Sequence, residues 1–310
     1  MLKINPVFTP KLWGGNKLKN EYGFDIKNNE PIGEAWIISA YPGNSSTTDE
    51  GIELNYLYKT NKELFNNYHT EDFPLLVKII DAQNNLSIQV HPNNEKAQEL
   101  ENYSFGKTEC WLILDAEKDT DIVIGVNANN KEQASNFIKQ KQWDKFLRRQ
   151  KINKGDLFDI EAGTVHAILG GTVVYELQQS SDITYRLYDF DRKESNGSLR
   201  ELHIDKSLEV IDYEKKDVKK KSSLILDKDN IKIHSLIKNE IFSLEKWDLN
   251  GETTLNLSNN KNFLLVTVIE GKANINGTEL ETYQSGIITA KELKEINLQG
   301  RAVILVGNPN

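Results

Sequence analysis

Three short strings of the sequence carry residues able to bind a metal: Ser87-Ile-Gln-Val-His91, Lys107-Thr-Glu109 and Gly163-Thr-Val-His166. They offer four candidate ligands: Gln89, His91, Glu109 and His166. Two imidazoles and one carboxylate suit a divalent metal such as zinc, iron or manganese. Three protein ligands and a weaker fourth leave a coordination position for water or a substrate oxygen, which distinguishes a catalytic site from a closed structural one. The pattern therefore predicts a catalytic metal centre.

The spacing within the strings supports convergence on one point. Residues two apart on a strand point to the same face, so Gln89 and His91 can share a metal, and Lys107 accompanies Glu109. Each residue alone is ambiguous, because a single histidine is more often a surface or core residue than a ligand. Glu109 stands in an apolar strand, where a carboxylate is costly unless it is paired or ligated. The inner face of a β-barrel or jelly roll would bring such distant segments together.

Most of the chain alternates with period two, which is typical of β-strands. The expected strands are 33–40, 75–80, 86–91, 109–114, 122–126, 157–160, 173–177 and 183–187. The expected helices are fewer: 54–65, 94–100 with a possible cap at Asn93, and 131–150. This mixture predicts a β-sandwich with a few helices laid against it.

Three parts follow one another along the chain. We expect a catalytic domain over 1–212, a charged linker over 213–230, and a smaller, non-catalytic β domain over 231–310. The last part shows strand periodicity at 231–234, 263–269, 286–289 and 302–306. Its one histidine, His234, has no ligand cluster around it in the sequence and is interpreted as structural.

Composition excludes several function classes. The 310 residues are long enough for two domains, and the net charge of −8 argues against a general nucleic-acid binder. No apolar run approaches the length of a membrane span. The segment from Met1 to Pro10 lacks a signal-peptide pattern, and one cysteine, Cys110, permits no intrachain disulfide. We therefore expect a cytoplasmic protein whose partner is neither nucleic acid nor a membrane.

Four ordered motifs carry a resemblance to a known family: Ile88-Gln-Val-His-Pro92, Gly106-Lys-Thr-Glu-Cys-Trp111, Ala162-Gly-Thr-Val-His-Ala-Ile168 and Ser181-Asp-Ile-Thr-Tyr-Arg186. The early strings Leu12-Trp-Gly-Gly15 and Gly33-Glu-Ala-Trp36 fit as well. The chain thus resembles type I mannose-6-phosphate isomerases in their short bacterial form. The resemblance implies a zinc enzyme with a cupin-type jelly roll, a second cupin-like β domain, and interconversion of mannose 6-phosphate and fructose 6-phosphate through an enediol.

The same resemblance assigns roles to individual residues. It implies that His91, Glu109 and His166 ligate Zn²⁺, with Gln89 as a fourth ligand of longer members. Arg186 matches an active-site arginine and Lys107 an active-site lysine, while Asp182 lies four residues before Arg186. We expect Lys107 to be the proton-transfer base, with a pKa lowered beside zinc and Arg186; a metal-bound hydroxide is the second candidate.

Two other interpretations stay open at this point. Two histidines and one carboxylate also suit the non-haem iron of an oxygenase, although oxygen chemistry has no evident need for Lys107. A non-catalytic sugar-binding cupin is the other, because fold alone does not give function. The sequence leaves open the oligomeric state and the residues that hold the phosphate.

Overall fold

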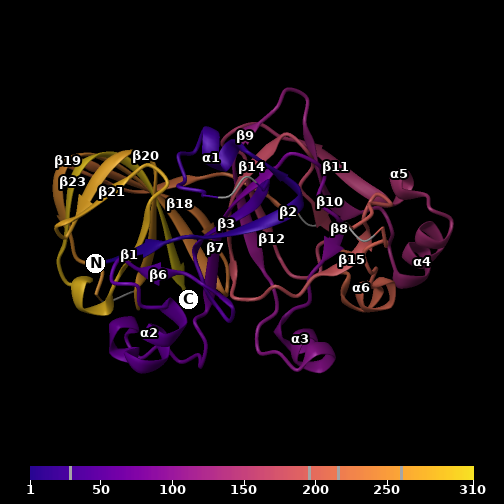
Figure 1. The fold of residues 1–310 in the computed structure, drawn as a ribbon, viewed down its shortest axis with the longest axis horizontal. Helices are drawn as coiled ribbons and strands as arrows, with labels where there is room; N and C mark the ends of the chain where they lie inside the picture. Colours follow the sequence, from indigo (N-terminus) through magenta and orange to yellow (C-terminus); the bar gives the residue numbers. More distant parts are fainter. Residues whose placement is uncertain (28–29, 195–196, 215–216, 259–260) are drawn as a thin grey trace.

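The computed structural model describes residues 1–27, 30–194, 197–214, 217–258 and 261–310. Within them, three large sheets lie next to one another along the long axis of the molecule (Figure 1). The seven-stranded sheet is in the middle, the five-stranded sheet is on one side with α4, α5 and α6, and the nine-stranded sheet is on the other. This arrangement confirms the expected mainly β class with a few helices laid against the sheets.

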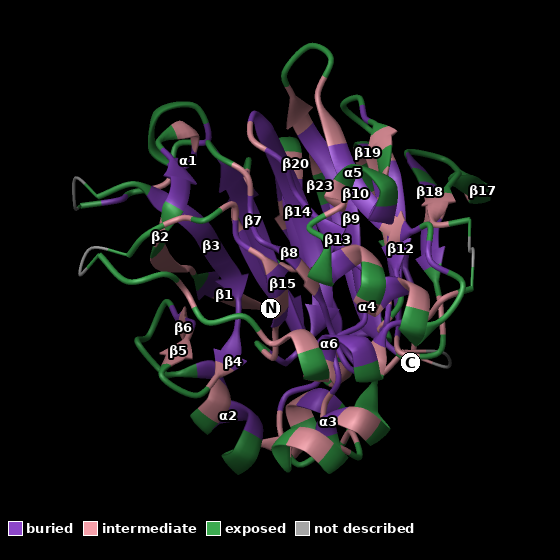
Figure 2. Cartoon of the chain, turned by 90° about the vertical axis from the view of Figure 1, so that its right-hand side faces the viewer, coloured by how far each residue is buried: buried purple, intermediate pink, exposed green. Residues whose placement is uncertain are grey.

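The central sheet has the order β16 (Lys219–Lys220), β12 (Leu157–Ile160), β9 (Glu109–Ala116), β14 (Thr172–Gln179), β7 (Leu75–Ala82), β2 (Val7–Gly15) and β3 (Ile32–Ile38). Every residue of β7 and β14 is buried (Figure 2). Tyr175 and Leu177 of β14 belong to the same apolar cluster as Leu265 of the nine-stranded sheet. Val174 instead shares a cluster with Ile124 of the five-stranded sheet. Since both faces of the sheet are covered, neither strand has an exposed position, and their charged residues, such as Lys78 and Glu176, are buried as well.

The five-stranded sheet holds most of the predicted ligand strings. Its order is β11 (Leu147–Lys151), β10 (Asp121–Val126), β13 (His166–Ala167), β8 (Ile88–Val90) and β15 (Tyr185–Tyr188). β15 is therefore an edge strand, next to α6 (Ile204–Val210). A separate two-stranded hairpin joins β4 (Ala40–Tyr41) and β5 (Asn44–Ser45).

The nine-stranded sheet combines strands from both ends of the chain. Its order is β17 (Ser223–Lys228), β18 (Ile231–Lys238), β19 (Phe242–Leu255), β23 (Ile296–Pro309), β20 (Leu264–Ile275), β22 (Ser285–Ile288), β1 (Leu2–Asn5) and β6 (Thr47–Thr48), with β21 (Thr278–Glu281) paired to β20. β1 and β6 come from the segment expected to form the catalytic domain. The expected linker 213–230 contains β16 and β17. The division into a catalytic and a non-catalytic domain stays a prediction.

The helices are short. They are α1 (Lys17–Asn20), α2 (Leu54–Thr60), α3 (Asn94–Glu101), α4 (Lys131–Lys139), α5 (Trp143–Phe146) and α6, with 3₁₀ turns η1 (Lys62–Phe65) and η2 (Ala290–Glu292). The cap expected at Asn93 is confirmed, because its side chain accepts a hydrogen bond from the backbone N–H of Lys96 at 2.9 Å. No helix of the described residues is long and apolar enough to cross a membrane.

The helix expected over 131–150 is divided into α4 and α5, and its end from Leu147 is wrong. α4 ends at Lys139, and Lys141 adopts a left-handed φ of 53°, which interrupts the helix. Residues from Leu147 then form β11, which pairs antiparallel with β10. The apolar spacing of this segment fits a helix, but the open edge of β10 provides backbone hydrogen bonds that local spacing does not reveal.

Candidate metal centre and active-site cavity

The predicted ligands come from two facing sheets. In the five-stranded sheet, β13 lies beside β8 with His166 opposite Gln89, and His91 directly follows β8. Glu109 is the first residue of β9 in the central sheet. The cluster therefore forms where the two sheets face one another, as the alternation of the strings predicts.

Three of the four predicted ligands meet in a compact cluster. Their donor atoms lie within 4.8 Å of one another, and all three side chains are buried. His166 Nε2 is 3.3 Å from Glu109 Oε1, and His91 Nε2 is 3.7 Å from Glu109 Oε2. Two imidazole nitrogens and a carboxylate thus face a common point.

The two imidazoles are oriented by backbone carbonyls. His91 Nδ1 donates to the carbonyl of Ile183 at 2.7 Å, and His166 Nδ1 donates to the carbonyl of Thr164 at 2.8 Å. A carbonyl oxygen only accepts, so Nδ1 carries the proton and Nε2 presents a lone pair to the cluster. Burial lowers the pKa of both rings, that of His166 to about 4, and the charge of Lys107 adds to the effect. Both rings are therefore neutral, as a metal ligand must be.

Two glycines permit the close approaches that build the cluster. A Cβ on Gly106 would lie 2.5 Å from the carbonyl oxygen of Pro92, so only glycine lets this segment run beside the residues after His91. The next residue, Lys107, donates its backbone N–H to that same carbonyl at 2.9 Å. Gly163 has a φ of +89° and donates its N–H to the His91 carbonyl at 2.8 Å, which sets the approach to His166.

Lys107 lies directly against the cluster. Its Nζ is 2.6 Å from Glu109 Oε2 and 3.1 Å from His91 Nε2, and the side chain is buried. Burial by itself would lower the pKa of Lys107, but the carboxylates of Glu109 and Glu176 outweigh it and raise that pKa above its usual value. The expected lowering of the Lys107 pKa depends on bound zinc and stays a prediction, and the protein's own carboxylates act against it.

Gln89 reaches the cluster with its amide nitrogen. Its Nε2 lies 3.4 Å from His166 Nε2, and its Oε1 accepts from Ser87 Oγ at 3.2 Å. To ligate a metal through its oxygen, Gln89 needs the opposite amide orientation, in which Oε1 and Nε2 exchange places. Gln89 as a fourth ligand stays a prediction.

The cluster suits a bound cation. Its donors are the nitrogen and oxygen types that divalent zinc accepts, and they already attract the Lys107 ammonium. Glu109 Oε1 is buried and has no hydrogen-bond partner within the described part of the chain. A buried carboxylate oxygen without a partner is costly unless a cation completes its environment. The residues present therefore fit a metal ion.

A cavity of about 400 Å³ opens beside the cluster. Among its lining residues are four that the sequence predicted: Gln89, Lys107, Asp182 and Arg186. Arg186 lies on β15 opposite Gln89 of β8, and Asp182 lies in the loop before β15. The structure thus brings the predicted catalytic residues to one space next to the candidate ligands.

Sequence reasoning missed a buried charge network in this cavity. Lys78 Nζ lies 4.0 Å from Glu34, 3.8 Å from Glu176 and 3.9 Å from Asp182. Trp36 Nε1 donates to Glu34 at 2.8 Å. Burial raises the pKa of Glu176, helped by Glu109, whereas Lys78 and Lys11 outweigh burial at Glu34 and lower its pKa to about 2. A charged residue within an apolar strand indicates a paired or ligated group. This pattern identified Glu109 in the sequence, and the same pattern is present at Lys78 and Glu176.

A segment after β15 adds residues that the sequence did not single out. Arg200, Glu201 and His203 line the cavity next to Arg186. Arg186 Nη1 donates to the carbonyl of Glu201 at 2.9 Å. Burial lowers the pKa of Arg186, and the like charge of Arg200 lowers it further. No motif marked this segment, since its approach to Arg186 depends on the path of the chain.

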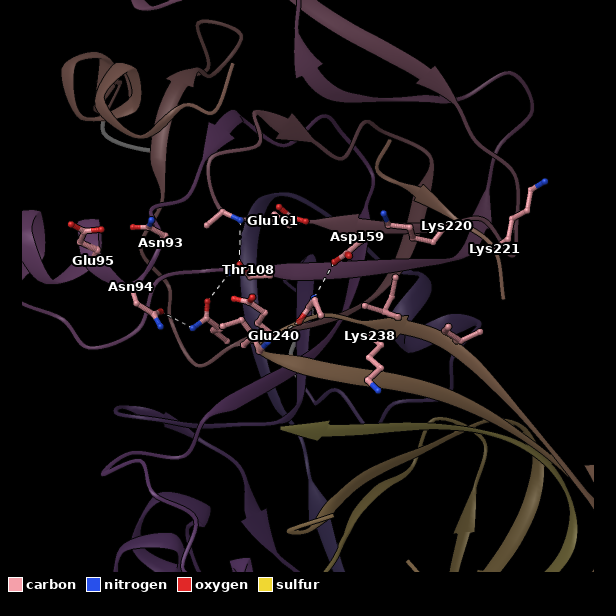
Figure 3. A pocket seen from close by; sticks show the side chains of 16 residues that line it. Asn93, Asn94, Glu95, Thr108, Asp159, Glu161, Lys220, Lys221, Lys238 and Glu240 are labelled. Carbon is pink, nitrogen blue, oxygen red and sulfur yellow. Dashed lines mark hydrogen bonds between the residues drawn. The ribbon is translucent and has the colours of Figure 1, made fainter. Parts of the chain in front are cut away.

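A larger cavity, of about 880 Å³, lies between the central sheet and the end of β18 (Figure 3). Thr108, Asp159 and Asn239 are among its lining residues. Asn239 Nδ2 donates to Asp159 Oδ1 at 3.1 Å, and Thr108 Oγ1 accepts from the N–H of Ala162 at 3.2 Å. These polar groups are thus bonded to one another, and none of the predicted site residues lines this cavity.

His234 lies apart from the cluster on β18. Its Nε2 is 3.3 Å from Asp248 Oδ2, and both side chains are partly exposed. His234 thus contacts a carboxylate at the surface, which agrees with its interpretation as structural.

The chain is similar to known proteins over almost its whole length. Residues 1–107 match the family model of the phosphomannose isomerase type I catalytic domain, and residues 232–309 match that of the mannose-6-phosphate isomerase cupin domain. A mannose-6-phosphate isomerase from Bacillus subtilis is 39% identical over 99% of this chain and 98% of its own length. One from Streptococcus mutans is 37% identical over 97% of this chain and 95% of its own. A crystal structure of a mannose 6-phosphate isomerase from Bacillus subtilis, 35% identical, superposes with a TM-score of 0.92 over 99% of this chain and 98% of that one.

Proposed function

Because the chain belongs to the type I phosphomannose isomerase family, we propose that His91, Glu109 and His166 hold the zinc ion of an aldose–ketose isomerase. The reaction of this family interconverts mannose 6-phosphate and fructose 6-phosphate, and the family resemblance covers both ends of the chain. The observation that carries the proposal is the buried His-Glu-His cluster beside a cavity lined by Lys107 and Arg186.

The reaction moves a proton between C2 and C1 through an enediol, so negative charge develops on a sugar oxygen. When bound, zinc would polarise the sugar oxygens as a Lewis acid. Arg186 supplies a fixed guanidinium, which the Glu201 carbonyl orients, and stabilises the developing oxyanion by hydrogen bonding. In this proposal Arg186 contributes to the transition state and does not ligate the metal.

Lys107 and Asp182 complete the proposed catalytic set. Lys107 Nζ contacts both His91 and Glu109 and lines the cavity, so it is placed to exchange a proton with the substrate. Asp182 lies 3.9 Å from Lys78 Nζ with about half of its side chain exposed, where it can accept hydrogen bonds from sugar hydroxyls. Gln89 is proposed as the weak fourth ligand.

An isomerase assay with metal analysis tests this function. Purified protein should convert mannose 6-phosphate to fructose 6-phosphate and contain about one Zn²⁺ per chain. Treatment with a chelator should abolish turnover, and added Zn²⁺ should restore it. Full activity in a metal-free preparation would refute the metal assignment, and iron with oxygen uptake in its place would favour an oxygenase.

The remaining expectations enter as part of the same proposal. We propose that residues 1–212 carry the catalysis and that 231–310 support them by packing, because the described residues of the latter hold no cluster of candidate ligands. The net charge of −8 supports a partner other than nucleic acid. A cytoplasmic location is part of this proposal.

A further inference from the structure

The lysines that line the cavity all have a carboxylate close by. The pairs are Lys11 with Glu34 at 3.2 Å, Lys78 with Glu176 at 3.8 Å, and Lys107 with Glu109 at 2.6 Å. Each of these ammonium groups therefore has its charge largely balanced by the protein, and none is a ready site for a further anion.

The two arginines of the cavity differ from the lysines. Arg186 has no carboxylate within ion-pair distance among the described residues; its Nη1 donates to a carbonyl, and its Nε is buried without a partner. Arg200 Nη1 lies 3.5 Å from Asp189 Oδ1, an oxygen that also accepts from Arg192 at 3.1 Å. The positive charge of the cavity is thus least balanced where Arg186 and Arg200 lie, and an anion would stabilise this end most.

The position of Arg200 relative to the ligand cluster follows from the strand order. His166 of β13 is opposite Gln89 of β8, and Gln89 is opposite Arg186 of β15. Each step is one strand spacing, about 4.8 Å. Beyond β15, His203 donates its N–H to the Arg186 carbonyl at 2.7 Å and accepts from the Arg186 N–H at 3.2 Å through Nδ1. This pair of bonds holds the segment that contains Arg200 against β15, the edge strand that lies two strands from His166.

We propose that Arg200 binds the phosphate group of the sugar phosphate and so sets the preference for phosphorylated substrates. The inference rests on the proposed function, in which C1 and C2 react at the His91–Glu109–His166 cluster. The phosphate is on C6, at the opposite end of the sugar chain, and therefore reaches the Arg200 end of the cavity. A guanidinium offers two parallel N–H donors that match two phosphate oxygens. The long contact to Asp189 orients this guanidinium and leaves donors for the phosphate.

Substrate and inhibitor constants of Arg200→Ala test the assignment. Loss of one charge-assisted contact should raise the KM for mannose 6-phosphate by about 10–100-fold, and should raise the Ki of inorganic phosphate, added as a competing anion, by the same factor. The Ki of unphosphorylated mannose should stay the same, because mannose lacks the group that Arg200 holds. Zinc content should also be unchanged. Arg200→Lys should recover part of the phosphate affinity, since it keeps the charge but not the planar fork.

Arg149→Ala is the matched control, since Arg149 is a partly exposed arginine of β11 that pairs with Asp121 away from the cavity. It should leave all three constants at wild-type values. If Arg200→Ala keeps the wild-type Ki for inorganic phosphate, or weakens mannose as much as phosphate, the assignment of Arg200 is wrong. Calorimetric titration of the wild-type and Arg200→Ala proteins with inorganic phosphate measures the same difference without turnover. Absence of isomerase activity in the wild type would instead refute the proposed function.

Discussion

Two regions of the molecule consist mainly of strands but bury different side chains: the five-stranded and central sheets on one hand, and residues 231–310 on the other. Around the five-stranded and central sheets, the buried Asp, Glu, Lys and His residues are Glu34, Lys78, Asp81, His91, Lys107, Glu109, Asp159, His166, Glu176 and Asp189. Within the described part of 231–310, the buried polar residues are all neutral: Ser243, Thr267, Ser285, Thr289 and Asn308. Burial of a charge is unfavourable unless it is paired or bound to a cation. The first region therefore buries charged groups at a cost in folding stability, and these groups form a site for chemistry. The second region buries only apolar and neutral polar groups, which stabilise the fold by packing.

The largest effect should come from removing a ligand. His166→Ala should lose the metal and reduce turnover about 10³-fold or more, because several kcal/mol of transition-state stabilisation disappear with the ion. Metal analysis and the isomerase assay measure the two losses. His234→Ala is the matched control from the nine-stranded sheet and should change neither. A comparable loss in His234→Ala would contradict the contrast between the two regions, because it would show that residues 231–310 take part in the reaction.

Arg186→Ala should separate charge stabilisation from metal binding. We expect a wild-type zinc content and a kcat lower by about 10²–10³-fold, the usual consequence of removing one oxyanion donor. Arg186→Lys should stay well below wild type, because an ammonium lacks the planar fork. A near wild-type rate in Arg186→Ala would reduce the residue to the structural partner of Glu201.

Trp247→Ala tests the packing region. Trp247 is fully buried in the apolar cluster of the nine-stranded sheet. Its truncation should destabilise the protein by about 3–5 kcal/mol through lost burial and a cavity. Denaturant unfolding should register this loss, while zinc per folded chain and KM stay unchanged. A variant with wild-type stability but impaired turnover would contradict the assigned role.

Glu34→Gln should give the smallest effect, a loss of stability that is present at neutral pH and disappears in acid. The folded-state pKa of Glu34 is about 2, below an unfolded value of about 4.3. A lowered folded-state pKa stabilises the protein above pH 4.3, and this contribution is lost as the pH falls towards 2. It is on the order of 3 kcal/mol, because each unit of pKa difference corresponds to about 1.4 kcal/mol. Unfolding free energies of wild type and variant should therefore converge over this range, and a constant difference between them would show that Lys78 and Lys11 do not hold the carboxylate ionised.

The sequence by itself determined features that depend on neighbouring residues. Period-two alternation placed most strands, because it records which face of a strand is buried. Asn93 marked the start of α3 through a local side-chain bond. The four motifs contain the three residues of the buried cluster. They also contain Gly106 and Gly163, which permit the close backbone approaches on which the cluster depends.

Only the tertiary structure decided the features that depend on contacts between distant segments. β11 replaced a predicted helix because β10 offered an open edge. β1 joined the nine-stranded sheet by pairing with β22, nearly the whole chain away. The Glu34–Lys78–Glu176 network joins charged side chains from three separate strands. Electrostatic energies depend on distance and burial, which the order of residues along the chain does not supply.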